Sequence, residues 1–124
     1  MTLHDVSWRG FASDNYSGVL PEVMAAVEGA NHGHQVAYGG DDYTAALGVK
    51  IAEIFGPQAQ VFPLFNGTGA NVVALTSMMP RWGAVICSTS GHIHTDEGGA
   101  PERVSGLKLY PVAPVAGKLT PEIV

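Results

Sequence analysis

Cysteine is almost absent from this chain of 124 residues, which contains a single thiol, Cys87. One cysteine excludes a disulfide within the chain and therefore the class of small disulfide-stapled folds. No apolar run reaches the length that spans a bilayer, because the densest stretches, at 61–65 and 84–87, have the length of a strand. The N-terminus lacks the basic and apolar stretches of a signal peptide, so we expect a cytoplasmic protein without a membrane segment.

Basic residues are also few: six Lys and Arg stand against eleven Asp and Glu, for a net charge of −5. The six are scattered along the sequence, which argues against the basic patch that a nucleic-acid-binding surface requires. Charged residues make up 14% and apolar residues 46%, a balance too apolar for a disordered segment. The length matches one domain that is large enough to bury a core.

Glycine and proline are frequent and divide the chain into predicted helices and strands. Pro21, followed by Glu22, is typical of a helix start, and the pair Gly56-Pro57 is typical of a helix end. The predicted helices cover residues 21–30, 43–55 and 70–79, the predicted strands cover 60–65, 84–87 and 107–112, and 91–102 is predicted as a loop. Strands that alternate with helices predict an α/β fold with a mainly parallel sheet and flanking helices.

The two ends of the sequence differ from its middle. Residues 1–20 are expected to form an extended N-terminal arm, and residues 21–124 the N-terminal part of a larger domain. Thr120, Pro121 and Glu122 are typical of a helix start, yet only two residues follow them. We therefore expect the chain to be truncated, and a frayed C-terminal tail is the alternative.

The segment Gly67-Thr68-Gly69 lies between a predicted strand and a predicted helix. Glycine lets the backbone approach a ligand, free N–H groups at a helix start favour an anion, and Thr68 adds a hydroxyl donor. An α/β sheet binds phosphate at such a position. The motif matches neither the Rossmann glycine pattern nor the P-loop, so an ordinary tight turn stays an alternative.

His92 and His94 stand two residues apart, with Asp96 beyond them. In an extended segment these three side chains share a face, which would suit a metal-dependent hydrolase. The alternative is one working histidine among solvated polar neighbours. Ser13 lies in a polar turn with no histidine at a spacing diagnostic of a catalytic triad, and Cys87 is predicted to be a packed thiol.

Seven segments, in order along nearly the whole chain, carry a resemblance to a known family. They are FASDNYSG (11–18), ANHGHQ (30–35), AYG (37–39), FNGTGAN (65–71), VIC (85–87), DEGGAPE (96–102) and GKLTPE (117–122). Together they resemble the low-specificity L-threonine aldolases, pyridoxal-phosphate enzymes of the aspartate-aminotransferase-like fold (fold type I). The resemblance implies that residues 21–124 belong to the large domain that binds pyridoxal 5'-phosphate (PLP).

The resemblance also assigns site residues. It implies that Gly67 and Thr68 bind the PLP phosphate and that His92 stacks on the pyridine ring. Ser13 is implied to lie near the substrate carboxylate, and Tyr38 on a loop that reaches toward the active site of a neighbouring subunit. The neighbours of His92 that become parts of the supporting loop are His94, Asp96 and Glu97.

The implied activity is the cleavage of L-threonine and L-allo-threonine to glycine and acetaldehyde, with PLP as the electron sink. The resemblance implies a homo-oligomer, specifically a tetramer, with the active site near a subunit interface. It also implies that the substrate is a small amino acid and that no metal is bound. Rival functions are another fold-type-I lyase, such as a β-eliminating lyase, and a non-catalytic binding domain.

Some features depart from the family. Gly40 stands where many relatives carry the first acid of a Tyr-Gly-Asp-Asp run, and Gly69 replaces an alanine or a glutamine. The family's Schiff-base lysine follows a late strand, and none of Lys50, Lys108 and Lys118 matches it. No catalytic residue is therefore predicted in this chain, and the chain alone is expected to be inactive.

Overall fold

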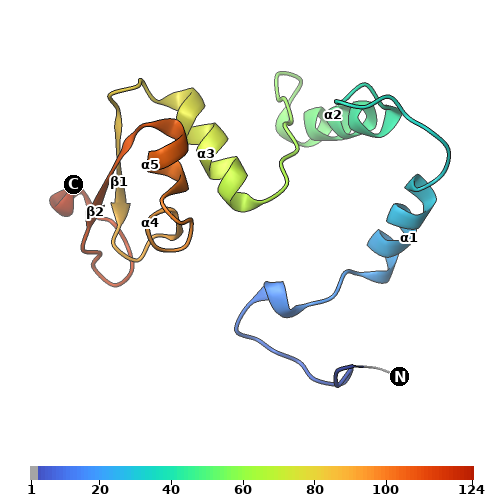
Figure 1. Ribbon diagram of the computed structural model, residues 1–124, viewed down its shortest axis with the longest axis horizontal. Coiled ribbons are helices and arrows are strands. Elements are labelled where there is room, and N and C mark those ends of the chain that lie inside the picture. The colour runs from blue at the N-terminus through green and yellow to red at the C-terminus, as the bar shows by residue number, and fades with distance from the viewer. Residues whose placement is uncertain (1–2) are drawn as a thin grey trace. The chain divides into compact units, whose positions relative to one another are not determined.

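The computed structural model describes residues 3–124, which divide into two units, one ending at Gln60 and the other beginning at Val61 (Figure 1). The first unit contains a short 3-10 helix, η1 (Asp14–Tyr16), and the helices α1 (Pro21–Ala30) and α2 (Asp42–Phe55). The second contains, in chain order, α3 (Gly67–Met78), β1 (Ala84–Ser88), α4 (His92–Thr95), α5 (Ala100–Ser105), β2 (Lys108–Val112) and the 3-10 helix η2 (Pro121–Ile123).

The helices α1 and α2 confirm the two helices predicted in the first half of the chain. Pro21 occupies the first turn of α1. Asp41 caps α2, because its carboxylate accepts hydrogen bonds from the backbone N–H and the hydroxyl of Thr44, both at 2.7 Å. These bonds, the hydroxyl bond first, hold the pKa of Asp41 below its ordinary value. Gly56 ends α2 with a φ of 100°, a backbone angle that suits glycine.

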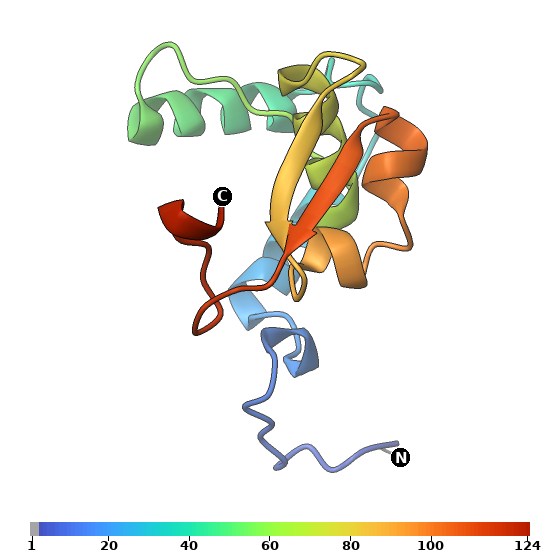
Figure 2. The ribbon, with the colours of Figure 1, turned by 90° about the vertical axis from the view of Figure 1, so that its left-hand side faces the viewer.

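The strands β1 and β2 pair in parallel, with Ala84 beside Lys108 and Ser88 beside Val112. This pairing confirms the predicted α/β fold with parallel strands. Parallel strands need a crossover connection, and here the crossover contains α4 and α5. The helices α3, α4 and α5 lie on one side of the strand pair in both views (Figures 1 and 2).

The core of the second unit lies between the strand pair and these helices. Its buried apolar side chains are Cys87, Leu107 and Leu109, against which Leu75, Val85 and Ile93 pack. Burial alternates along β2, since Leu109 is buried while Lys108 and Tyr110 on either side of it are exposed. Such alternation is typical of a strand with one covered face.

The strand predicted at 60–65 is wrong, because the structure has an irregular segment there. An apolar run becomes a strand only when a neighbouring strand takes its hydrogen bonds, and Pro63 has no N–H to donate. Between residues 3 and 124 only β1 and β2 form a sheet. The helix α3 begins at Gly67, three residues earlier than predicted, since the side chain of Asn66 accepts a hydrogen bond from Gly69 N–H at 2.8 Å.

The loop predicted at 91–102 is wrong for most of its length, because α4 and α5 form there. Neither helix has a side-chain cap, and glycines, Gly91 and Gly99, precede them. Burial stabilises them instead. Ile93 of α4 packs against the core, and Pro101 in the first turn of α5 is fully buried.

The helix start predicted from Thr120 to Glu122 appears as the single turn η2, with Thr120 at its N-cap position. The arm predicted at 1–20 and the larger domain predicted from residue 21 stay predictions. Within residues 3–124, every helix is too short or too polar to cross a membrane.

Cys87 gives a test of the core. The residue is 6% exposed, burial raises the pKa of its thiol, and the charge of Glu102 raises this pKa further. We expect alkylation of Cys87 at pH 8 to be at least about 10-fold slower in the folded complete protein than after unfolding in urea. Mass spectrometry of the peptide that contains Cys87 measures this ratio.

The same shift predicts how Cys87 links stability to pH. The thiol is harder to ionise in the folded state than in the unfolded state. The stabilisation that the protonated thiol gives the folded state is therefore complete at pH values below the ordinary thiol pKa. The contribution declines as the pH rises past that value.

Equal labelling rates in the folded and unfolded protein would contradict the buried position of Cys87.

Candidate functional site

The N-terminus of α3 presents free hydrogen-bond donors. Asn66 takes the N–H of Gly69 with its side chain and the N–H of Ala70 with its carbonyl oxygen, at 2.8 and 3.1 Å. The backbone N–H groups of Gly67 and Thr68 donate to no protein acceptor in the described part of the chain. Together with the Thr68 hydroxyl and the positive end of the helix dipole, they form a group of donors that suits an anion.

The local structure explains why glycine suits position 69. A Cβ added there would lie 3.3 Å from Oδ1 of Asn66, so a side chain would press on the cap. A Cβ at Gly67 would meet no atom within 4 Å, which leaves open space beside the free donors. A larger residue at position 69 would therefore require Asn66 to shift slightly.

His92 is the first residue of α4, and its ring contacts a buried carboxylate. Nδ1 of His92 lies 2.8 Å from Oε1 of Glu97, whose side chain is completely buried while that of His92 is 65% exposed. The same Oε1 accepts a hydrogen bond from Nδ2 of Asn71 at 2.6 Å. Asn71 lies one turn beyond Gly67 in α3. The structure therefore brings His92 next to the helix whose N-terminus carries the free donors.

The link between Asn71, Glu97 and His92 does not follow from sequence patterns, because 26 residues separate Asn71 from Glu97. One signal was present in the sequence. Asn71 is a carboxamide directly before the apolar run 72–75, and a carboxamide turned toward a protein interior needs a hydrogen-bonding partner. The identity of that partner depends on the fold.

The prediction that His92, His94 and Asp96 share a face of an extended segment is wrong. His92 and His94 lie on the helix α4, where residues two apart point about 200° apart around the axis. Asp96 accepts a hydrogen bond from the hydroxyl of Thr95 at 2.6 Å. Among residues 3–124, no three His, Cys, Asp or Glu side chains form a group that could hold a metal ion. The geometric reason for a metal-dependent hydrolase is thereby removed.

Ser13, predicted to lie near the substrate carboxylate, is in the first unit. It precedes η1, and its hydroxyl accepts a hydrogen bond from the N–H of Asn15 at 3.2 Å. Its carbonyl oxygen accepts the N–H of Tyr16 at 3.2 Å. The polar turn is therefore present as expected, and the contact with substrate stays a prediction.

Tyr38 also lies in the first unit, in a tight turn. Gly40 N–H donates to the carbonyl oxygen of Ala37, and Tyr38 and Gly39 have φ angles of 61° and 80°. A positive φ is uncommon for a bulky residue. The side chain of Tyr38 is fully exposed. A Cβ at Gly40 would approach Cγ1 of Val36 to 2.9 Å, which favours glycine in this turn.

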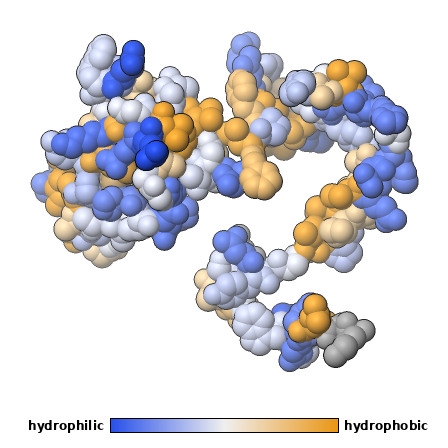
Figure 3. Space-filling view, viewed as in Figure 1, coloured by the Kyte–Doolittle hydropathy of each residue, from blue (hydrophilic) through white to orange (hydrophobic). Residues whose placement is uncertain are grey.

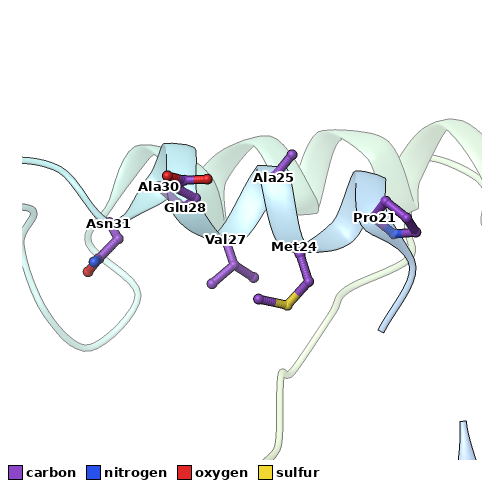
Figure 4. A pocket seen from close by; sticks show the side chains of 7 residues that line it. All are labelled: Pro21, Met24, Ala25, Val27, Glu28, Ala30 and Asn31. Atoms are coloured by element: carbon purple, nitrogen blue, oxygen red, sulfur yellow. The ribbon is translucent and has the colours of Figure 1, made fainter. Parts of the chain in front are cut away.

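A shallow depression runs along α1 and contains none of the predicted site residues (Figure 4). It is lined by Pro21, Met24, Ala25, Val27, Glu28, Ala30 and Asn31. All seven come from one helix and its C-cap, and Met24 and Val27 extend from the same side of it. Apolar surface is visible along this helix in Figure 3. The depression is thus an apolar helix face.

Comparison with known proteins identifies the family. The pattern of the family described as "Beta-eliminating lyase" matches residues 10–124. The chain belongs to the beta-eliminating lyase family. This lyase-family chain is 51% identical over 112 residues to a low specificity L-threonine aldolase from a Pseudomonas species and 48% identical over 112 residues to one from Pseudomonas aeruginosa. Both alignments cover 90% of the chain and 32% of the relative, so the chain spans about a third of these relatives.

A solved structure described as a Leishmania major threonine aldolase resembles this lyase-family chain with a TM-score of 0.78. The identity is 30%, and the match covers 87% of the chain and 32% of the solved chain. The resemblance to the threonine aldolases and the fold-type-I architecture are therefore confirmed.

Proposed function

We propose that the complete protein cleaves L-threonine and L-allo-threonine to glycine and acetaldehyde, with PLP as its cofactor. The observation that carries this proposal is the placement of the free donors of α3 and the imidazole of His92 on elements joined by Glu97. The names of the relatives from Pseudomonas, and of the solved structure from Leishmania major, support the same reaction.

The residues present fit PLP at both of its ends. A phosphate group is an anion, and the N–H groups of Gly67 and Thr68 are free to bind it at the start of α3. The exposed ring of His92 offers a flat aromatic face to a pyridine ring. When bound, PLP would accept the electron pair released by the Cα–Cβ bond of the substrate. Gly67, Thr68 and His92 contribute by fixing where that ring lies.

Ser13 and Tyr38 are proposed to contact the substrate. The hydroxyl of Ser13 is a donor for the substrate carboxylate. The exposed Tyr38 on its tight turn is proposed to reach the site of a neighbouring subunit. This role requires a homo-oligomer, which the family resemblance implies to be a tetramer. The free thiol of Cys87 is compatible with a cytoplasmic location, and the proposed substrate would make the protein an enzyme of amino-acid metabolism.

The test uses the complete protein after purification. We expect a yellow chromophore that borohydride bleaches, and equal amounts of glycine and acetaldehyde from L-threonine. β-Elimination would instead release ammonia, together with 2-oxobutyrate from L-threonine or pyruvate from L-serine, so a panel of amino acids separates the two reactions. A colourless protein, or 2-oxobutyrate and ammonia in place of glycine from L-threonine, would contradict the proposal.

His92 and His94 form a matched pair of positions for a second measurement. We expect His92→Asn to lower kcat/KM for L-threonine by about 10-fold, because one stacking contact is lost. His94 points to another side of α4, so His94→Asn should leave kcat/KM unchanged. Equal effects of the two substitutions would remove His92 from the proposed site.

A further inference from the structure

Glu97 has a buried carboxylate whose two oxygens differ in their hydrogen-bond partners. Its Oε1 accepts a hydrogen bond from Asn71 at 2.6 Å and lies 2.8 Å from Nδ1 of His92. Its Oε2 is buried and has no hydrogen-bond partner within residues 3–124. Burying a carboxylate costs free energy unless it is paired and hydrogen-bonded. The contacts that Glu97 does make are therefore informative about its role.

The two contacts of Oε1 lead to different elements. Asn71 lies in α3, on the turn that follows the free N–H groups of Gly67 and Thr68. His92 begins α4, and Glu97 follows the end of this helix. One buried oxygen thus connects the anion-binding end of α3 with the exposed imidazole ring.

A carboxylate oxygen only accepts hydrogen bonds, so its partner on a neutral imidazole must be the nitrogen that carries the proton. In the neutral form of His92, the 2.8 Å contact with Glu97 therefore favours the tautomer with the hydrogen on Nδ1 and the lone pair on Nε2. The hydrogen bond also restrains rotation of the ring about its side-chain torsions. Asn71 holds the carboxylate in place by its own bond to Oε1.

We propose that Glu97 is a positioning residue, which fixes the plane and the tautomer of His92 before the cofactor arrives. This inference rests on the proposed function, in which His92 stacks on PLP. A ring that is already ordered loses less conformational freedom when a ligand stacks on it. Glu97 and Asn71 do not touch the cofactor in this proposal. They act through His92.

The first measurement is the affinity of the complete apo-protein for PLP, followed by the visible circular dichroism of the bound cofactor. We expect Glu97→Gln to weaken PLP binding by about 10-fold, a size typical of losing a group that orients a ligand-binding side chain. We also expect it to change the dichroic band. Asp96→Asn is the matched control, because Asp96 is an adjacent acid with only a local bond to Thr95.

A double-mutant cycle separates positioning from a merely structural role. If Glu97 acts through His92, Glu97→Gln has no further effect on PLP affinity in a His92→Asn background. An equal loss in both backgrounds, or wild-type affinity and dichroism in Glu97→Gln, would overturn the proposal. Should Glu97→Gln fail to fold, Asn71→Ala takes its place, since it removes a single support of the carboxylate and should weaken binding in the same direction.

A second readout does not need PLP. In the apo-protein labelled with ¹⁵N-histidine, NMR should show His92 with its proton on Nδ1, and Glu97→Gln should move the proton toward Nε2. A wild-type protein that binds no PLP would refute the proposed function, while this tautomer measurement would still decide whether Glu97 controls His92. A His92 tautomer that is the same in wild type and variant would refute the positioning role.

Discussion

Replacing Thr68 by glutamate is expected to weaken the affinity of the complete protein for PLP by about 100-fold or more. Hydrogen bonds to a charged group contribute roughly 1.5–3 kcal/mol each, and the new carboxylate would both displace the hydroxyl donor and repel the phosphate. Thr68 is the second residue of α3, directly beside the free N–H groups. Titration of the apo-protein with PLP, followed by absorbance, measures the change.

This substitution separates ligand binding from folding. An acidic residue in the first turn of a helix stabilises the helix, by about 0.5 kcal/mol at an exposed position. Thr68→Glu should therefore lose PLP while the thermal midpoint of the apo-protein stays the same or rises. Loss of PLP binding together with a large fall in the midpoint would point to misfolding as the cause.

A matched control lies at the other end of the same helix. Ser77 is an exposed residue near the end of α3. Ser77→Glu adds the same charge there, far from the free donors, and should change PLP affinity by less than about twofold. Unchanged affinity in Thr68→Glu, with the expected result in Ser77→Glu, would show that the phosphate binds elsewhere and would refute the anion site at α3.

The parts of the fold that could be predicted depend on local chemistry. Pro21 at a helix start and Gly56 at a helix end act through the backbone angles of the residues themselves, and both predictions are confirmed. The strand predicted at 60–65 is wrong, because a strand also requires a partner that the apolar pattern does not reveal. The helices α4 and α5 depend on burial of Ile93 and Pro101, which is a property of the folded second unit.

In the candidate site, too, some features follow from local chemistry and others depend on the folded structure. Free donors at Gly67 and Thr68 could be predicted because a helix start and two glycines are visible in the sequence, and the binding of an anion there stays a prediction. The grouping of His92 with His94 is wrong because it assumed an extended segment where α4 forms. The contact of His92 with Glu97 joins α4 to Asn71 in α3, and such a contact is known only once the chain is folded.

The second prediction with a large expected effect concerns a polypeptide of residues 1–124 by itself. We expect it to release no glycine from L-threonine at any PLP concentration, in contrast to the activity proposed for the complete protein. None of Lys50, Lys108 and Lys118 matches the Schiff-base lysine that the family resemblance requires. The groups proposed here hold the cofactor and position its ring, which are binding tasks, and the family resemblance implies that turnover requires that lysine as well.

The same polypeptide is also expected to fold poorly, and the structure gives the reason. The helices α1 and α2 have no buried residue, and large apolar side chains such as Phe11 and Phe65 are almost completely exposed. In the second unit the buried apolar core consists of Cys87, Leu107 and Leu109. A unit of this size is marginally stable even with a full core, and exposed apolar side chains favour association.

Three measurements on that polypeptide check this expectation: thermal unfolding by circular dichroism, size-exclusion chromatography and binding of a hydrophobic dye. We expect a broad transition, association and strong dye binding, in contrast to a sharp transition of the complete protein. Ile86 of β1 and Tyr110 of β2 are also exposed, and they add to the apolar surface that would favour association. A sharp transition in a monodisperse monomer would show that these side chains are compatible with an independent domain, and would favour the rival of a self-contained binding domain.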